Sequence, residues 1–389
     1  MAELDVDGRQ RGPLLTILTV AVSAALSIGL AEGVIRALRP YNTPDTLRHY
    51  SLEYDAAVFA RHLMKPVNRL VEVDAAKAWG TKPPDEPTTQ AYFINEWGYR
   101  GPPFSPGKTP GTTRIVVLGG SAVFDQHVYD EGPDTNDWPH EIGRRLAKRG
   151  LRAEVINAGV PAHATPDSLG RLFGQLWLFE PDYVLVYHGW NDVKVWHRDA
   201  ITPENPLLRA VRPYDPDRNP LMSYRGTLDE LLASSQLYVK ARNHVLSRRQ
   251  SLGVEGVMGS GELGSEWGPL GPAQLRLNLH LLVDACRNVG AVPILATQGT
   301  LVTPGASEQA RSRIGYRYQM LTHDALAEAL AESNRIVRSV AEEKGALLLD
   351  VASQINGRED LFADHVHTTP AGSAELARIA EEFLAERLR

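Results

Sequence analysis

The 389-residue sequence has almost no cysteine and no excess of positive charge. Its single cysteine, Cys286, excludes an intramolecular disulfide, so cysteine content does not identify the compartment of the protein. Cys286 stands in a helical pattern and is interpreted as a small buried residue. The formal net charge is −6, which argues against a nucleic-acid partner, because such proteins usually concentrate basic residues on one face.

The usual signatures of metal sites are also missing. The sequence contains no His-Glu-x-x-His motif, and the histidines near other polar motifs are not spaced as zinc ligands usually are. We therefore expect neither a metal nor another cofactor. The histidines concerned are His188, His197, His365 and His367.

An uncharged apolar run, residues 13–31, follows a tail of residues 1–12. As a helix rising ~1.5 Å per residue it would be about 28 Å long, close to the ~30 Å hydrocarbon core of a bilayer, so it predicts a single membrane-spanning anchor. A cleaved signal peptide is the alternative, because Gly29 and Ala31 are small. The length of the run and the acidic residues before it favour the anchor. Similar numbers of arginine flank both sides, so the sidedness stays open.

After a connector, residues 32–112, short apolar strands alternate with helices. This order predicts an α/β domain over residues 113–389 with three layers, in which two layers of helices enclose a five-stranded, mostly parallel sheet of flavodoxin-like type. An insertion, residues 193–272, is interpreted as a lid, a binding element or a mobile segment. The predicted strands are residues 114–118, 153–157, 183–187, 292–296 and 346–350, and the main predicted helices are 138–149, 167–179, 273–288, 323–344 and 370–388.

Polar residues stand at the ends of the first three strands, and in a parallel sheet such ends meet at one edge. Ser121 follows two glycines, which let the chain turn sharply and let a substrate approach. Gly159 can present its backbone N–H to a negatively charged oxygen, and the side-chain amide of Asn191 can act as a second donor. Each motif alone is also compatible with an ordinary turn or helix cap.

A fourth polar motif, near the C-terminus, holds Asp364 and His367. On a turn, this spacing lets the carboxylate accept a hydrogen bond from Nδ1–H and leaves Nε2 free to take a proton from a serine. His365 is the alternative base, but its spacing from Asp364 is different. The four motifs together indicate a serine nucleophile activated by a histidine and an aspartate.

In this order the motifs resemble the four sequence blocks of the SGNH (GDSL-like) hydrolase superfamily, over residues 113–389 apart from the insertion. The resemblance implies that Ser121 is the nucleophile, that His367 is the general base and that Asp364 orients it. It also implies an oxyanion hole made by the backbone N–H groups of Ser121 and Gly159 and by the Asn191 amide.

Upstream residues resemble a membrane-anchored bacterial branch of that superfamily. A Glu-x-x-x-Arg element, Glu32 to Arg36, follows the apolar run, and an Asn-x-x-Gly-aromatic-Arg-Gly element spans residues 95–101. One departure is that Gly120 stands where the superfamily usually has an aspartate. The Gly-x-Ser-x-Gly motif is absent because Val123 occupies its last position, which disfavours an ordinary α/β-hydrolase.

The motifs and the resemblance together imply a membrane-anchored serine esterase. We expect its catalytic domain to be extracytoplasmic, although the flanking arginines leave the sidedness open. The enzyme would remove acyl groups, acetyl groups above all, from a cell-envelope glycan or a lipid-like ester. An O-acyltransferase of polysaccharide acetylation would use the same three residues and is the alternative. A non-catalytic glycan-binding subunit is a third possibility, because a fold alone does not guarantee a function. The oligomeric state is left open.

Overall fold

The computed structural model describes residues 8–38, 68–74, 89–194, 196–197, 226–251 and 261–388. The chain divides into two compact units, which are described separately below. The first joins Met1–Ala56 to Val211–Val257, and the second joins Ala57–Ala210 to Met258–Arg389. These limits fall inside the predicted connector and the predicted insertion, so the middle of the insertion groups with the N-terminal segment.

A five-stranded parallel sheet forms the centre of the second unit, as predicted. The strands lie in the order β4-β3-β5-β6-β7. The chain thus adds β4 on one side of β3 and then crosses over to add β5, β6 and β7 on the other side. This is the flavodoxin-like order. The strands are β3 (Thr113–Gly119), β4 (Ala153–Gly159), β5 (Tyr183–Tyr187), β6 (Val292–Ala296) and β7 (Leu347–Leu349).

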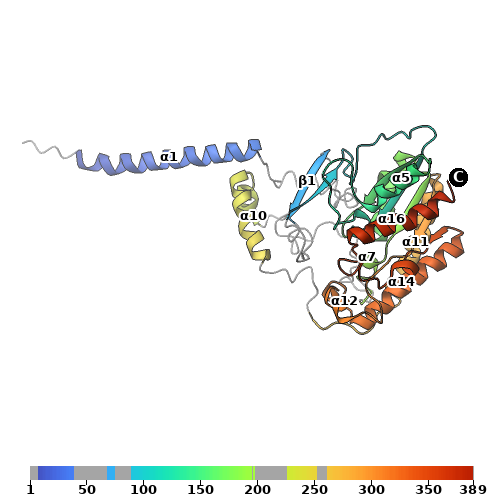
Figure 1. Cartoon of the computed structure of the whole chain (residues 1–389). Helices are drawn as coiled ribbons and strands as arrows, with labels where there is room; N and C mark the ends of the chain where they lie inside the picture. Colours follow the sequence, from blue (N-terminus) through green and yellow to red (C-terminus); the bar gives the residue numbers. More distant parts are fainter. Residues whose placement is uncertain are drawn as a thin grey trace, which may run out of the picture. The chain divides into compact units, whose positions relative to one another are not determined.

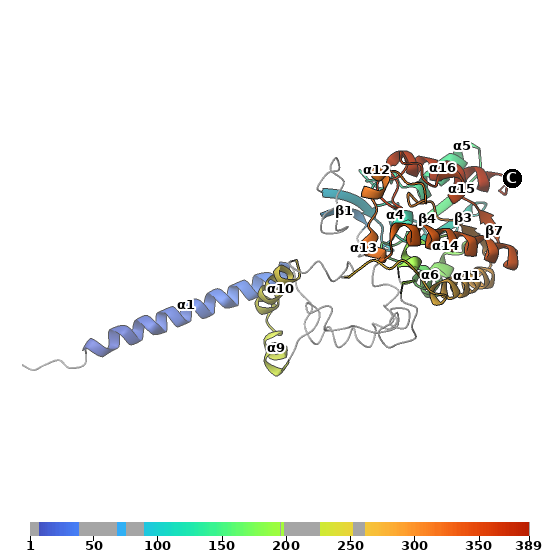
Figure 2. The ribbon, with the colours of Figure 1, turned by 90° about the horizontal axis from the view of Figure 1, so that it is seen from below.

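Helices cover both faces of the sheet, and Figure 2 shows the resulting three layers. One face packs against α6 (Thr165–Gly174), α11 (Leu270–Asn288) and α14 (His323–Lys344). The other face packs against α5 (Trp138–Lys148) and α16 (Pro370–Ala385). The predicted three-layer α/β/α architecture is therefore confirmed.

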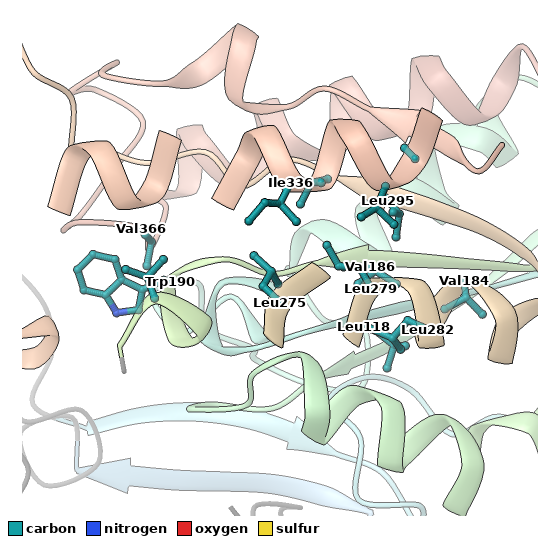
Figure 3. Close-up of a cluster of buried hydrophobic side chains, with 14 of the residues drawn as sticks. Leu118, Val184, Val186, Trp190, Leu275, Leu279, Leu282, Leu295, Ile336 and Val366 are labelled. Carbon is teal, nitrogen blue, oxygen red and sulfur yellow. The ribbon is translucent and has the colours of Figure 1, made fainter. Parts of the chain in front are cut away.

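Alternate side chains of each strand enter different hydrophobic clusters. In β3, Val116 and Leu118 belong to the cluster under α11 and α14, whereas Ile115 and Val117 belong to the cluster under α5 and α16. Figure 3 shows the first of these clusters. Because both faces are buried, the strands are continuous apolar runs, which explains why their limits were readable from the sequence.

Short elements follow the strands at the edge where the polar motifs lie. They are α4 (Ser121–Phe124) after β3, α7 (Trp190–Val193) after β5, α12 (Glu308–Ser312) and α13 (Tyr316–Gln319) after β6, and α15 (Ala352–Ile355) after β7. A 3₁₀ turn, η1 (Leu176–Phe179), instead leads from α6 into β5 at the opposite edge. An antiparallel pair, β1 (Arg69–Asp74) and β2 (Thr89–Ile94), precedes these elements. An isolated bridge joins Arg100 to Asn157 of β4, so the end of the predicted connector packs on the sheet.

The first unit contains α1 (Gly8–Leu38), α9 (Gly226–Leu232) and α10 (Gln236–Ser251); Figure 1 labels α1 and α10, and Figure 2 labels all three. Helix α1 is longer than the predicted span of residues 13–31. Its segment Leu15–Leu38 has a mean hydropathy of 1.9, and none of that apolar window is buried. By length and composition α1 can cross a membrane, although a signal sequence near an N-terminus has the same properties.

Candidate active site

Ser121, His367 and Asp364 form a continuous chain of hydrogen bonds. Ser121 begins α4 directly after β3, and His367 lies on the loop before α16. The Nε2 of His367 is 2.6 Å from the Oγ of Ser121, and its Nδ1 is 2.7 Å from the Oδ2 of Asp364. Because an ionised carboxylate can only accept, Nδ1 carries the proton and Nε2 accepts from the serine hydroxyl. Two segments 246 residues apart thus meet at the predicted edge of the sheet.

Asp364 is held by backbone and by imidazole groups. Its Oδ1 accepts hydrogen bonds from the backbone N–H groups of Val366 (3.0 Å) and His367 (2.9 Å). Burial alone would raise the pKa of Asp364, but the neighbouring imidazoles of His365 and His367 and the hydrogen bonds to its oxygens keep the pKa well below its usual value. The carboxylate therefore stays ionised and can orient His367 throughout the neutral pH range.

His365, the alternative base, has a different place. Its ring stacks on Trp190 with 3.9 Å between the ring centroids. Burial lowers the pKa of His365 to about 4, so this imidazole is neutral at pH 7. The ring that contacts the Ser121 hydroxyl is that of His367, and His365 instead forms part of the wall around Asp364.

Asn191 lies directly beside the residue that precedes Ser121. Its Nδ2 donates a hydrogen bond to the backbone oxygen of His163 (2.9 Å). A Cβ atom placed on Gly120 would be only 2.7 Å from that Nδ2 and 2.9 Å from that oxygen. Gly120 therefore gives the Asn191 amide and the turn at His163 the room they occupy, which is a physical reason for the missing aspartate.

Gly159 is not placed as the sequence suggested. Its backbone N–H already donates to the Oδ1 of Asn157 (3.0 Å), and the residue is buried. A Cβ atom on Gly159 would be 2.3 Å from the backbone nitrogen of Phe124. The glycine is thus needed for the close approach of β4 to α4, and it does not offer the available donor that we predicted for an oxyanion hole.

Ala162, three residues further along the same loop, was not singled out from the sequence. It has a φ of 69°, which is unusual for a residue with a Cβ atom, and it is exposed. The turn that contains it is closed by a hydrogen bond from the N–H of His163 to the oxygen of Val160 (3.1 Å). No sequence signal distinguishes such an alanine, because its conformation is set by the turn around it.

The loop after α4 is clamped by Arg100, whose side chain is fully buried. Its guanidinium donates five hydrogen bonds, to the backbone oxygens of Phe124 (2.6 Å), Asp125 (2.8 Å) and Val128 (2.8 Å) and to the two carboxylate oxygens of Asp130 (2.6 and 2.9 Å). The Asn-x-x-Gly-aromatic-Arg-Gly element noted in the sequence therefore fixes the backbone that follows Ser121.

Asp125 joins that loop to the segment carrying His367. Its carboxylate accepts hydrogen bonds from the hydroxyls of Thr368 (3.2 Å) and Ser373 (2.5 Å) and from the backbone N–H of Trp138 (3.1 Å). Burial raises the pKa of Asp125 to about 6, although Arg100 opposes the rise. Arg100 and Asp125 together hold the two halves of the site in register.

His127, Asp364 and His367 form the group, within the described part of the chain, whose ligand atoms could hold a metal ion, all lying within 4.8 Å of one another. Two of the three are already bonded to each other through Nδ1 of His367. Asp364 and His367 are already used in the hydrogen-bonded chain to Ser121, and the expectation of no cofactor stays a prediction.

Comparisons with known proteins place this geometry in a family. No curated protein matches the sequence. Among solved structures, the chain is similar to the lipase/acylhydrolase from Enterococcus faecalis, with 18% identity and a TM-score of 0.41 over 72% of this chain and 98% of that chain. It is also similar to a variant of an acetyl xylan esterase from Geobacillus stearothermophilus, with 17% identity and a TM-score of 0.40 over 70% and 94%. The model of the GDSL-like Lipase/Acylhydrolase family matches residues 117–374, more than half of the chain, so this protein belongs to that family of carboxylic ester hydrolases.

Proposed function

We propose that the protein is a membrane-anchored serine esterase in which Ser121 is the nucleophile, His367 the general base and Asp364 the residue that orients it. The observation that carries the proposal is the unbroken chain of hydrogen bonds from the Ser121 hydroxyl through His367 to Asp364. The distances lie within the range in which a base takes the proton of a nucleophile.

In the proposed reaction, the Ser121 oxygen attacks the ester carbonyl while His367 Nε2 takes the hydroxyl proton. The tetrahedral intermediate collapses, His367 returns that proton to the leaving alcohol, and an acyl-serine remains. Water then attacks the acyl-serine with His367 as base, which releases the carboxylic acid and restores the hydroxyl of Ser121. Asp364 stabilises the imidazolium in both half-reactions.

The oxyanion would be held by the backbone N–H of Ser121, by Asn191 and by the backbone N–H of Ala162 in place of Gly159. Ser121 is the first residue of α4, where N–H groups have no acceptor within the helix. The amide of Asn191 has a second hydrogen besides the one given to His163. Ala162 lies on the turn that packs against Gly120, and the residue is exposed, so a substrate can approach this turn.

Membrane anchoring by α1 is part of the proposal. The hydroxyls of Thr19 and Ser27 donate to the backbone oxygens four residues earlier, Leu15 and Ser23, so these polar groups are satisfied inside the helix, as a bilayer requires. An anchored enzyme meets esters near a bilayer, and we propose an acyl group, acetyl above all, on a cell-envelope glycan or lipid-like molecule outside the cytoplasm.

The test uses the full chain in detergent micelles with p-nitrophenyl acetate and a fluorophosphonate probe. We expect Ser121→Ala to lose covalent labelling and nearly all hydrolysis, while the matched control Ser312→Ala, at an exposed serine on α12, keeps both. Wild-type rates in Ser121→Ala would refute the proposal. Adding an oligosaccharide acceptor distinguishes hydrolysis from acyl transfer, since a transferase would form acylated oligosaccharide instead of free acid.

A further inference from the structure

An apolar face on α9 has no function in the site described above. Leu228, Leu231 and Leu232 are spaced so that they share one side of the helix, and they are 68%, 69% and 39% exposed. The carboxylate of the neighbouring Asp229 accepts hydrogen bonds from the hydroxyl of Tyr238 (2.6 Å) and from Nε and Nη2 of Arg242 (3.0 and 3.1 Å). Helices α9 and α10 are thus tied together through polar groups, while the leucines point elsewhere.

The start of α10 is attached to α1 through Glu32. One carboxylate oxygen accepts from the backbone N–H of Gln236 (2.7 Å), and the other accepts from the N–H of Leu237 (2.8 Å) and the hydroxyl of Ser235 (2.9 Å). Arg36, one turn further on, binds Glu32 (2.7 Å) and the backbone oxygen of Ser234 (2.6 Å). Glu32 therefore satisfies N–H groups that the first turn of α10 would otherwise leave unpaired.

This attachment fixes the depth of α9 and α10 relative to the apolar segment of α1. Glu32 is the first charged residue after the apolar run, so it marks the level at which a spanning helix leaves the hydrocarbon. Figures 1 and 2 show α10 crossing the C-terminal end of α1. A helix that crosses the end of a membrane-spanning helix lies along the bilayer surface. Besides Arg242, which binds Asp229, helix α10 carries three basic residues and no acidic one, as suits contact with anionic headgroups.

We infer that α9 and α10 form a membrane-docking element in which Leu228, Leu231 and Leu232 enter the boundary between headgroups and acyl chains of the bilayer that α1 spans. Such helices bury their apolar side about 5–10 Å into this boundary. The occupant of the leucine face is therefore lipid. The inference rests on the proposed membrane anchor, and it interprets the middle of the insertion as a surface that docks on the membrane.

The test places single NBD fluorophores on the full-length protein in liposomes that contain anionic lipid and spin-labelled lipid. The native Cys286 is buried, which raises the pKa of its thiol to about 12 and leaves it unreactive toward the labelling reagent. Labels are attached at Leu231→Cys on the leucine face, at Ser312→Cys as an exposed polar control on α12 outside the docking element, and at Leu26→Cys in the apolar part of α1.

We expect spin labels near the headgroups to quench the label at position 231 several-fold more than the label at 312, and spin labels at the bilayer centre to quench the label at 26. Glu32→Ala should remove most of the quenching at 231 and leave that at 26 unchanged. Quenching at 26 with none at 231 would overturn the docking element alone, as would a blue-shifted label at 231 that lipid does not quench, because protein would then cover the leucines. No quenching at 26 would overturn the anchor and the docking element together.

Discussion

The clamp at Arg100 provides the most demanding test of the site architecture, through the substitution Arg100→Lys. The charge is kept, but an ammonium group has three donors whereas the guanidinium makes five hydrogen bonds, so at least two of these buried hydrogen bonds are lost. A hydrogen bond that involves a charged group contributes about 1.5–3 kcal/mol, so the loss of two lowers the free energy of unfolding by about 3–6 kcal/mol. That is a large share of the ~5–15 kcal/mol typical of a folded protein.

Urea unfolding of the full chain in detergent, followed by tryptophan fluorescence, measures this loss, and p-nitrophenyl acetate hydrolysis measures activity. Because Arg100 fixes the backbone that leads to Asp125, we also expect kcat to fall, since a displacement of ~1 Å in a site can cost ~10²-fold in rate. The control is Arg378→Lys. Arg378 forms ion pairs with Glu375 and Glu382 at the surface, so this substitution should lower the free energy of unfolding by less than ~1 kcal/mol. If Arg100→Lys were as stable as this control, the guanidinium would not be a clamp.

Three further outcomes are expected from single substitutions. Asn191→Ala should lower kcat by ~10²–10³-fold with little change in unfolding, because an oxyanion donor acts in the transition state; an unchanged kcat would exclude that role. Gly120→Ala should also lower kcat, because the added Cβ would lie only 2.7 Å from the Nδ2 of Asn191 and would push that amide away. A kcat equal to that of the wild type would show that the present position of this amide is not needed. Burial lowers the pKa of His188 to about 3, so protonation disfavours the folded state and stability is lost as pH falls from 6.5 towards 3. Between pH 6.5 and pH 4, the free energy of unfolding of His188→Gln should therefore fall by about 3 kcal/mol less than that of the wild type. Parallel pH profiles of the two free energies would contradict this reasoning.

Sequence reasoning succeeded where a residue's neighbours are dictated by periodicity. The five strands were located to within about two residues of their ends because strands buried on both faces must be apolar throughout. The same reasoning placed Ser121 and Asn191 at one edge of the sheet, because parallel strands present their carboxyl ends together. The Asp364–His367 turn follows no strand directly, so the packing of the loop before α16 decides its contact with Ser121.

Sequence reasoning failed where the partner or the conformation of a backbone group depends on contacts that no local pattern predicts. Gly159 was chosen as a donor because glycine exposes its N–H, but the Asn157 side chain two residues earlier occupies that group. Ala162 has the backbone conformation expected of glycine, and its sequence gives no sign of it. The role of Arg100 was also hidden, since a charged residue is usually exposed.

By itself, the sequence determined the three-layer sheet, the apolar helix near the N-terminus and the identity of the residues that can carry acyl chemistry, because hydrophobic periodicity and residue chemistry are local properties of the chain. Only the tertiary structure decided which donors are available, which imidazole reaches the serine and that Glu32 of α1 accepts from the first N–H groups of α10. These depend on hydrogen bonds between segments separated by as many as 246 residues, and such bonds are formed only when packing brings the segments together.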